Sequence, residues 1–287
     1  MTSSYITLLM PLGTILQFFV PRWLALLFAH LGGRIAYRFN PSRRKLLLEN
    51  CRHILGPDIP RKLLERTARQ TFINLAINYA DLMRTPVLKK GVIKLVEFDP
   101  TYINRTLAQK KGAILVTAHI GNWDLAGVFM AALGYPLSAV VEQIPRGWTK
   151  TFNRYRCATN METIPISDLR AMTRAIHHRR ILTLVADRDL TKHGILCPAF
   201  DARRSFPKGP AAYSLKYKIP LVIGYFVAQN KPGHPPYLSV IDPQLQFKPT
   251  GQLHADIASF TRLIASRLNE IIRSYPDQWF VFQTGWQ

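Results

Sequence analysis

The sequence predicts an α/β fold: a mostly parallel central sheet flanked by helices, with a helical, hydrophobic N-terminal extension. Three observations predict it. The first 33 residues are apolar almost without interruption. Amphipathic helical patterns follow, up to about residue 84. Beyond them, compact apolar runs alternate with helical patterns, and alternating strands and helices are typical of a parallel sheet covered by helices.

The chain length and composition exclude a disordered polymer. The 287 residues are 48% hydrophobic and 19% charged, so an unfolded chain would leave too much apolar surface in water. The formal net charge of +21 indicates an anionic partner, either nucleic acid or an anionic membrane surface. Cys51, Cys157 and Cys197 are far apart and have no zinc-site spacing, so we expect buried thiols, no metal and a reducing environment.

The N-terminal segment has three possible roles. Residues 5–33 are apolar, but Pro11, Gly13 and the pair Pro21-Arg22 interrupt them. The segment is therefore a poorly formed single span, a helix lying in the membrane interface, or a hydrophobic entry helix of the fold. We predict that residues 1–40 form a membrane-anchoring segment and that residues 41–287 form a single α/β domain.

Basic residues concentrate directly after this apolar segment. Between Arg22 and Lys90 there are 14 Lys and Arg against four acids. Cations beside an apolar segment are typical of binding to an anionic leaflet, where each contributes about 1 kcal/mol. We therefore expect anionic membrane lipids as partners and a location at the cytoplasmic face of the inner membrane. The alternative is that these cations lie on solvated faces of ordinary helices.

The secondary structure of the remaining chain can be predicted from its periodicity. Apolar residues spaced three and four apart predict helices over 43–55, 61–84, 101–110, 123–133, 149–160, 168–179, 209–218 and 252–274. Short apolar runs between turn residues predict strands at 112–118, 137–142, 181–187, 220–227 and 237–241.

His119 is the strongest candidate for a catalytic residue. It follows the predicted strand 112–118, and ligands of such sheets gather at the carboxyl ends of the strands. Asn122 suits a helix N-cap, which places Asp124 in the first helical turn, where its carboxylate could fold back toward the imidazole. A histidine held by a carboxylate can act as a general base. The alternative is a structural loop histidine and an acid that only complements the helix dipole.

Several runs of the sequence resemble a known family. TAHIGNWDLAG resembles the HxxxxD motif of the glycerolipid and lysophospholipid acyltransferase superfamily. The similarity is greatest to its branch of late lipid A biosynthesis acyltransferases and phosphatidylinositol mannoside acyltransferases. ADRDL, PKGPAAYSL and PDQWFVF match that branch in character and order. ADRDL is closer to the mannoside-acylating enzymes, and the chain lacks the basic C-terminal tail typical of the lipid A enzymes.

The resemblance implies a membrane-associated O-acyltransferase. His119 would be the general base and Asp124 its orienting partner. The donor would be an acyl-CoA or acyl carrier protein thioester, with no metal or bound cofactor, and the acceptor a hydroxyl of a glycolipid or lysophospholipid. Backbone N–H groups around Gly121 are candidate oxyanion donors. The expected substrate-binding residues are Asn122, Glu142, Arg154, Arg156, Asp187, Arg188 and Arg204.

The net charge alone leaves an alternative open, a non-catalytic basic protein that binds membranes or nucleic acid. We find no nucleic-acid-binding signature, and the basic residues adjoin an apolar segment, so no nucleic-acid partner is expected. The residues leave open the acceptor lipid, the acyl chain length and the choice of donor.

Overall fold

The computed structural model describes residues 13–16, 19–142, 161–229 and 231–287. The predicted helix 149–160, with Arg154 and Arg156, lies outside the described residues, as do Cys157 and most of the first 20 residues.

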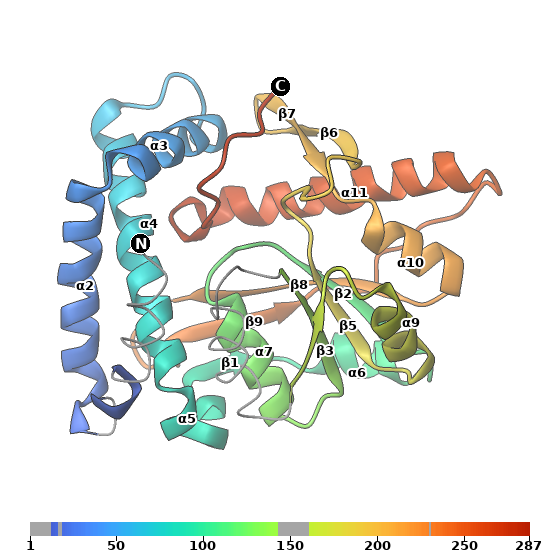
Figure 1. Cartoon of the computed structure of the whole chain (residues 1–287), viewed down its shortest axis with the longest axis horizontal. Coiled ribbons are helices and arrows are strands. Elements are labelled where there is room, and N and C mark those ends of the chain that lie inside the picture. Colours follow the sequence, from blue (N-terminus) through green and yellow to red (C-terminus); the bar gives the residue numbers. More distant parts are fainter. Residues whose placement is uncertain (1–12, 17–18, 143–160, 230) are drawn as a thin grey trace.

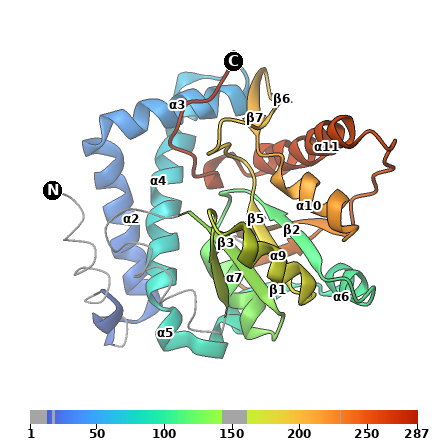
Figure 2. The same cartoon turned by 45° about the vertical axis from the view of Figure 1, so that its right-hand side comes forward.

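Three long helices form the N-terminal part of the fold (Figures 1 and 2): α2 (Arg22–Phe39), α3 (Pro41–Leu55) and α4 (Arg61–Met83). Small residues let α2 and α4 pack closely, because Ala25, Ala29 and Gly33 are the buried residues of α2. A Cβ at Gly33 would lie only 2.5 Å from the Cα of Ile73. The short α5 (Thr85–Leu88) and η1 (Lys89–Leu95) lead from α4 to the sheet.

A seven-stranded sheet occupies the centre of the molecule, with the order β1-β9-β8-β2-β5-β3-β4. All neighbouring pairs are parallel except β8 and β9. The strands are β1 (Val96–Phe98), β2 (Ala113–Thr117), β3 (Leu137–Val141), β4 (Glu162–Pro165), β5 (Ile181–Val185), β8 (Leu221–Ala228) and β9 (Tyr237–Ile241). The five predicted strands and the mostly parallel sheet are confirmed.

Helices cover both faces of the sheet, which is why its central strands are continuously apolar. On one face, Ile114 and Val116 of β2 pack with the core of α9 (Leu169–His177), α10 (Gly209–Tyr217) and α11 (Leu253–Ser274). On the other face, Ala113 and Leu115 pack with α6 (Thr101–Leu107) and α7 (Trp123–Ala132).

Two further elements close the fold above the carboxyl ends of the strands. The hairpin of β6 (Ile195–Ala199) and β7 (Ala202–Phe206) packs beside α11. The C-terminal segment, which begins with η3 (Pro276–Gln278), then runs past β7, where Arg203 and Gln287 exchange backbone hydrogen bonds.

The predicted hydrophobic extension is described only in part. Within the described ranges, no helix is both long and apolar enough to cross a bilayer. The described apolar helix, α2, packs one face against α4 and exposes the other.

Candidate active site

The loop after β2 places His119 at the carboxyl edge of the sheet. The backbone turns at Gly121, whose φ is +55° and where a Cβ would lie 1.7 Å from the carbonyl oxygen of Phe226, so no other residue fits. Asn122 then caps α7, its side-chain oxygen accepting from the N–H of Leu125 at 3.1 Å. The loop is therefore held in one conformation.

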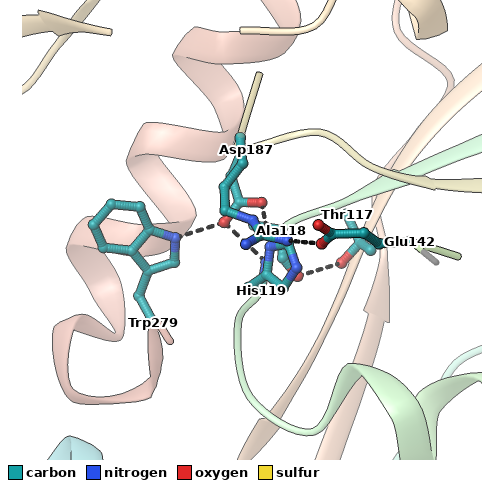
Figure 3. Close-up of polar contacts among 7 residues, drawn as sticks. Thr117, Ala118, His119, Glu142, Asp187 and Trp279 are labelled. Atoms are coloured by element: carbon teal, nitrogen blue, oxygen red, sulfur yellow. Dashed lines mark hydrogen bonds and ion pairs between the residues drawn. The ribbon is translucent and has the colours of Figure 1, made fainter. Parts of the chain in front are cut away.

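Asp187 holds the imidazole of His119 (Figure 3). Its Oδ1 lies 2.7 Å from His119 Nδ1, and its Oδ2 accepts from the His119 backbone N–H at 3.0 Å. The indole Nε1–H of Trp279 donates to the same Oδ2 at 2.7 Å. Because an ionised carboxylate can only accept, Nδ1 carries a proton, and Nε2 is the ring nitrogen left to act on a substrate.

The environment of Asp187 keeps its carboxylate charged. Its side chain is 1% exposed. Burial by itself would raise the pKa of Asp187, but the facing imidazole and the hydrogen bonds from His119 and Trp279 outweigh burial and hold the pKa well below its usual range. An ionised, immobile carboxylate stabilises a protonated imidazole, as a general base requires.

Asp124 lies in the first turn of α7 and lines the same cavity as His119. The sequence-based hypothesis made Asp124 the partner that orients the imidazole, whereas Nδ1 bonds to Asp187. Asp187, expected to bind substrate, is buried behind the ring instead. The role of Asp124 toward His119 stays a prediction.

A cavity of about 440 Å³ opens at His119 and extends between the sheet and α7. Its volume suits a sizeable organic ligand. Polar side chains stand at its rim, including those of His119, Asp124, Glu142 and Arg188. The rest of its lining is mostly apolar and includes Leu115, Met130, Leu137, Met161, Phe226 and Ile241, with the hydroxyls of Thr183 and Ser239 among them.

Glu142 and Arg188, both expected to bind substrate, form an ion pair at this rim. Arg188 Nη2 donates to Glu142 Oε2 at 2.9 Å, and the Glu142 side chain is 47% exposed. The buried Nε of Arg188 has no hydrogen-bond partner among the described residues.

Two of the other expected substrate-binding residues lie elsewhere. Asn122 is 2% exposed and caps α7, and it is not among the residues lining the cavity. Arg204 is 5% exposed and packs against two tryptophan rings, also outside the lining. Arg154 and Arg156 lie outside the described residues.

The backbone donors expected around Gly121 are already in use. The N–H of Gly121 donates to the Gln278 carbonyl at 2.8 Å, and the N–H of Asn122 donates to the Phe226 carbonyl at 3.0 Å. They fix the loop and are not available to an oxyanion. Within the described part of the chain, no cluster of His, Cys, Asp and Glu is arranged to hold a metal ion.

The sequence is similar to a known family and to named proteins. The family model described as bacterial lipid A biosynthesis acyltransferase matches residues 1–287. A phosphatidylinositol mannoside acyltransferase of Mycolicibacterium smegmatis is 25% identical over 253 residues, 84% of this chain and 78% of that protein. One of Mycobacterium tuberculosis is 26% identical over 191 residues, 64% of this chain and 58% of that protein.

Proposed function

Because the chain belongs to the bacterial lipid A biosynthesis acyltransferase family, we propose that it moves a fatty acyl chain from a thioester donor to a hydroxyl of a membrane glycolipid or lysophospholipid. The observation that carries this proposal is the imidazole of His119, held at Nδ1 by a buried carboxylate, at the rim of a cavity with an apolar interior. The donor is an acyl-CoA or an acyl carrier protein.

The reaction is a single acyl transfer in two chemical steps. Nε2 of His119 takes the proton of the acceptor hydroxyl, and the oxygen attacks the thioester carbonyl carbon. The tetrahedral intermediate then collapses, the C–S bond breaks, and the leaving thiolate recovers the proton from the imidazolium. Asp187 stabilises the imidazolium between the two steps.

The oxyanion of the intermediate needs a preorganised donor near His119. Arg188 is suited to this role because it lines the cavity and is oriented by Glu142. The α7 N-terminus, where Trp123 and Asp124 also line the cavity, adds the positive end of a helix dipole.

The apolar interior of the cavity suits the acyl chain. Gly127 lines it from α7, and a Cβ at this position would come within 2.5 Å of Met161 Sδ and 3.7 Å of Leu137 Cδ2. A larger side chain here would fill the space between α7 and the sheet. We therefore expect Gly127→Val to favour donors with shorter acyl chains, measured by competition between decanoyl-CoA and palmitoyl-CoA.

The acceptor is of the lipid A or phosphatidylinositol mannoside type. The relatives named above carry the second activity in their names, and ADRDL at residues 186–190 is closer in character to that group. Purified full-length protein can be offered a phosphatidylinositol mannoside or a lipid A precursor, each with palmitoyl-CoA or palmitoyl-acyl carrier protein, and the products weighed by mass spectrometry.

The decisive variant is His119→Ala, which should lower transfer by about 10²–10⁴-fold because the general base is lost. His234→Ala is the matched control: this histidine also bonds to a carboxylate, at 2.8 Å from Glu97, but does not line the cavity. Transfer at the wild-type rate by His119→Ala, or none by the wild type to any acceptor, would refute the proposal.

The outer face of α2 supports an interfacial location at the membrane. Large apolar residues lie four apart along this face and are each at least half exposed; they are Trp23, Leu27, Leu31, Ile35 and Phe39. Exposed Arg34 and Arg38 lie on the same helix and suit anionic head groups. We propose that α2 lies in the cytoplasmic face of the inner membrane.

Flotation with phosphatidylglycerol-containing vesicles tests this location. The double variant Leu27→Glu/Leu31→Glu should lose most of its vesicle binding. The matched control is Leu169→Glu/Leu253→Glu, which alters two similarly exposed leucines on α9 and α11. Equal flotation of the two double variants would exclude α2 as the membrane-binding face.

A further inference from the structure

Arg204 of β7 is a buried cation packed against two aromatic rings. Its side chain is 5% exposed. The guanidinium carbon lies 5.0 Å from the ring centre of Trp279 and 4.6 Å from that of Trp286. Burying a charge is costly unless something compensates for it, so this position needs a physical reason.

Hydrogen bonding does not fully compensate for the burial. Nη1 of Arg204 is buried and has no hydrogen-bond partner among the described residues. Burial lowers the pKa of Arg204, while the negative charge of Asp187 acts in the opposite direction and the positive charge of Arg188 adds to the lowering. The nearby anion that favours this cation is thus Asp187, the carboxylate that holds His119.

The two rings fix the guanidinium in relation to that carboxylate. Trp279 both stacks on Arg204 and donates its Nε1–H to Asp187 Oδ2 at 2.7 Å. Trp286 is held in turn, because its Nε1–H donates to Asn50 Oδ1 at 2.8 Å and its backbone bridges that of Arg204. Contacts with both rings therefore restrain the position of the guanidinium.

We propose that Arg204 is a positioning residue of the active site, which seats Trp279 against Asp187 and places a fixed positive charge behind that carboxylate and the imidazole it holds. Arg204 touches neither the cavity nor His119, so it acts through Asp187. The expected effect of Arg204 on catalysis rests on the proposed function. The expected effect of its charge on the imidazole of His119 rests only on the buried cluster of Arg204, Trp279 and Asp187.

Other charged groups face this cluster from neighbouring elements and also influence the pH dependence of His119. Arg188 lies beside Asp187 and is paired with Glu142, and Asp124 lies on the cavity side of His119. Behind Trp286, His53 of α3 packs on the ring, with centroids 4.2 Å apart, and bonds to Asp201. These groups are the same in every variant compared below.

The test compares substitutions of Arg204 that remove its charge with one that keeps it, all with long side chains. The variants are Arg204→Met and Arg204→Gln, which are neutral, and Arg204→Lys, which retains the charge. The control is Arg203→Met, which removes an exposed cation from the same strand. Each full-length protein is examined for acyl transfer from palmitoyl-CoA to a phosphatidylinositol mannoside as a function of pH. The rate of His119 carbethoxylation by diethyl pyrocarbonate, followed by mass spectrometry, is measured over the same range.

The expected result is a shift in pH dependence and not merely a loss of rate. A nearby cation disfavours protonation of the imidazole, so its removal should move the midpoint of carbethoxylation, and the acid limb of the rate profile, upward by about 0.5–1 pH unit. Arg204→Lys should keep the wild-type midpoint. We also expect kcat to fall about 10-fold or more in both neutral variants, because they loosen Asp187.

Unchanged midpoints in both neutral variants would overturn the proposal, even if the rate falls. So would loss of the fold in both while Arg204→Lys stays folded, since the charge would then serve folding. If no acceptor is acylated by the wild type but the carbethoxylation midpoint still moves, the proposed function fails and the inference about Arg204 survives.

Discussion

Two carboxylates lie on opposite sides of the candidate active site, and their environments differ sharply. Asp187 is 1% exposed and accepts hydrogen bonds from the His119 ring, the His119 backbone and the Trp279 indole. Glu142 is 47% exposed and is held by Arg188. Both follow parallel strands at the same edge of the sheet.

The difference in burial and bonding suits the two carboxylates to different roles. A carboxylate that is buried and fully bonded cannot exchange partners, so it is suited to fixing the imidazole and stabilising its charge. A half-exposed carboxylate with one flexible partner can rearrange when a substrate arrives. We therefore expect substitutions at Asp187 to change kcat and substitutions at Glu142 to change KM.

The largest effect is expected from Asp187→Asn. An amide cannot stabilise the imidazolium and can present its N–H to the ring, which favours the wrong tautomer. We expect kcat to fall about 10²–10⁴-fold with little change in KM, measured by steady-state transfer from palmitoyl-CoA. A change confined to KM would show that Asp187 contacts substrate, as the sequence first suggested.

A smaller effect is expected from Glu142→Gln. The amide keeps a hydrogen bond to Arg188 but loses the ion pair, which is partly exposed and therefore weak. We expect KM to rise about 3–10-fold and kcat to stay within about threefold, in the same assay, because the amide still orients Arg188 for the chemical step while the lost charge weakens substrate binding. A loss of kcat as large as that of Asp187→Asn would remove the distinction between the two carboxylates.

A stability effect is expected from Trp279→Phe, which deletes the indole donor to Asp187 and leaves a buried charged acceptor less satisfied. We expect a loss of about 1.5–3 kcal/mol in the free energy of unfolding, measured by urea denaturation. Trp286→Phe is the control, since its indole donates to the neutral Asn50. Equal losses of unfolding free energy in the two variants would contradict the expectation that the hydrogen bond to the charged Asp187 contributes more than the one to Asn50.

The smallest effect concerns pH. Since the pKa of Asp187 is lowered in the folded state from the ordinary 3.8, the unfolded chain binds this proton first. Its contribution to stability is therefore complete above about pH 5 and is lost as the pH falls through about 4 and below. The difference in unfolding free energy between the wild type and Asp187→Asn should narrow at pH 3.5 relative to pH 7. A constant difference would mean that the Asp187 pKa is not lowered.

Most of the fold follows from the sequence because the central strands are buried on both faces and read as unbroken apolar runs. Two of the strands that were missed, β4 and β7, lack this signal. β4 is Glu-Thr-Ile-Pro at the sheet edge, and β7 carries two arginines, so neither looks like a buried strand. Local periodicity cannot reveal them, because their pairing partners define them.

The site was predicted in part. His119 and the polar rim follow from their positions after apolar strands, but the partner of His119 does not. Local spacing favoured Asp124, five residues away, whereas Asp187 is 68 residues away. β2 and β5 pair in parallel with Thr117 opposite Val185, and this register continued by two residues sets His119 opposite Asp187. The signal was present, but using it requires the strand order, which the sequence alone does not state.

The close packing of α2 against α4 has a consequence for substrate access to the active site. α4 holds the loop that carries His119, because Asn78 of α4 donates its side-chain N–H to the Gly121 carbonyl at 2.8 Å. About one turn further along α4, Asp81 accepts two hydrogen bonds from the guanidinium of Arg22 of α2. In the proposed location of α2 at the membrane interface, these contacts would fix the distance between the imidazole of His119 and the hydrocarbon, and this distance would select which hydroxyls of a lipid head group come within reach.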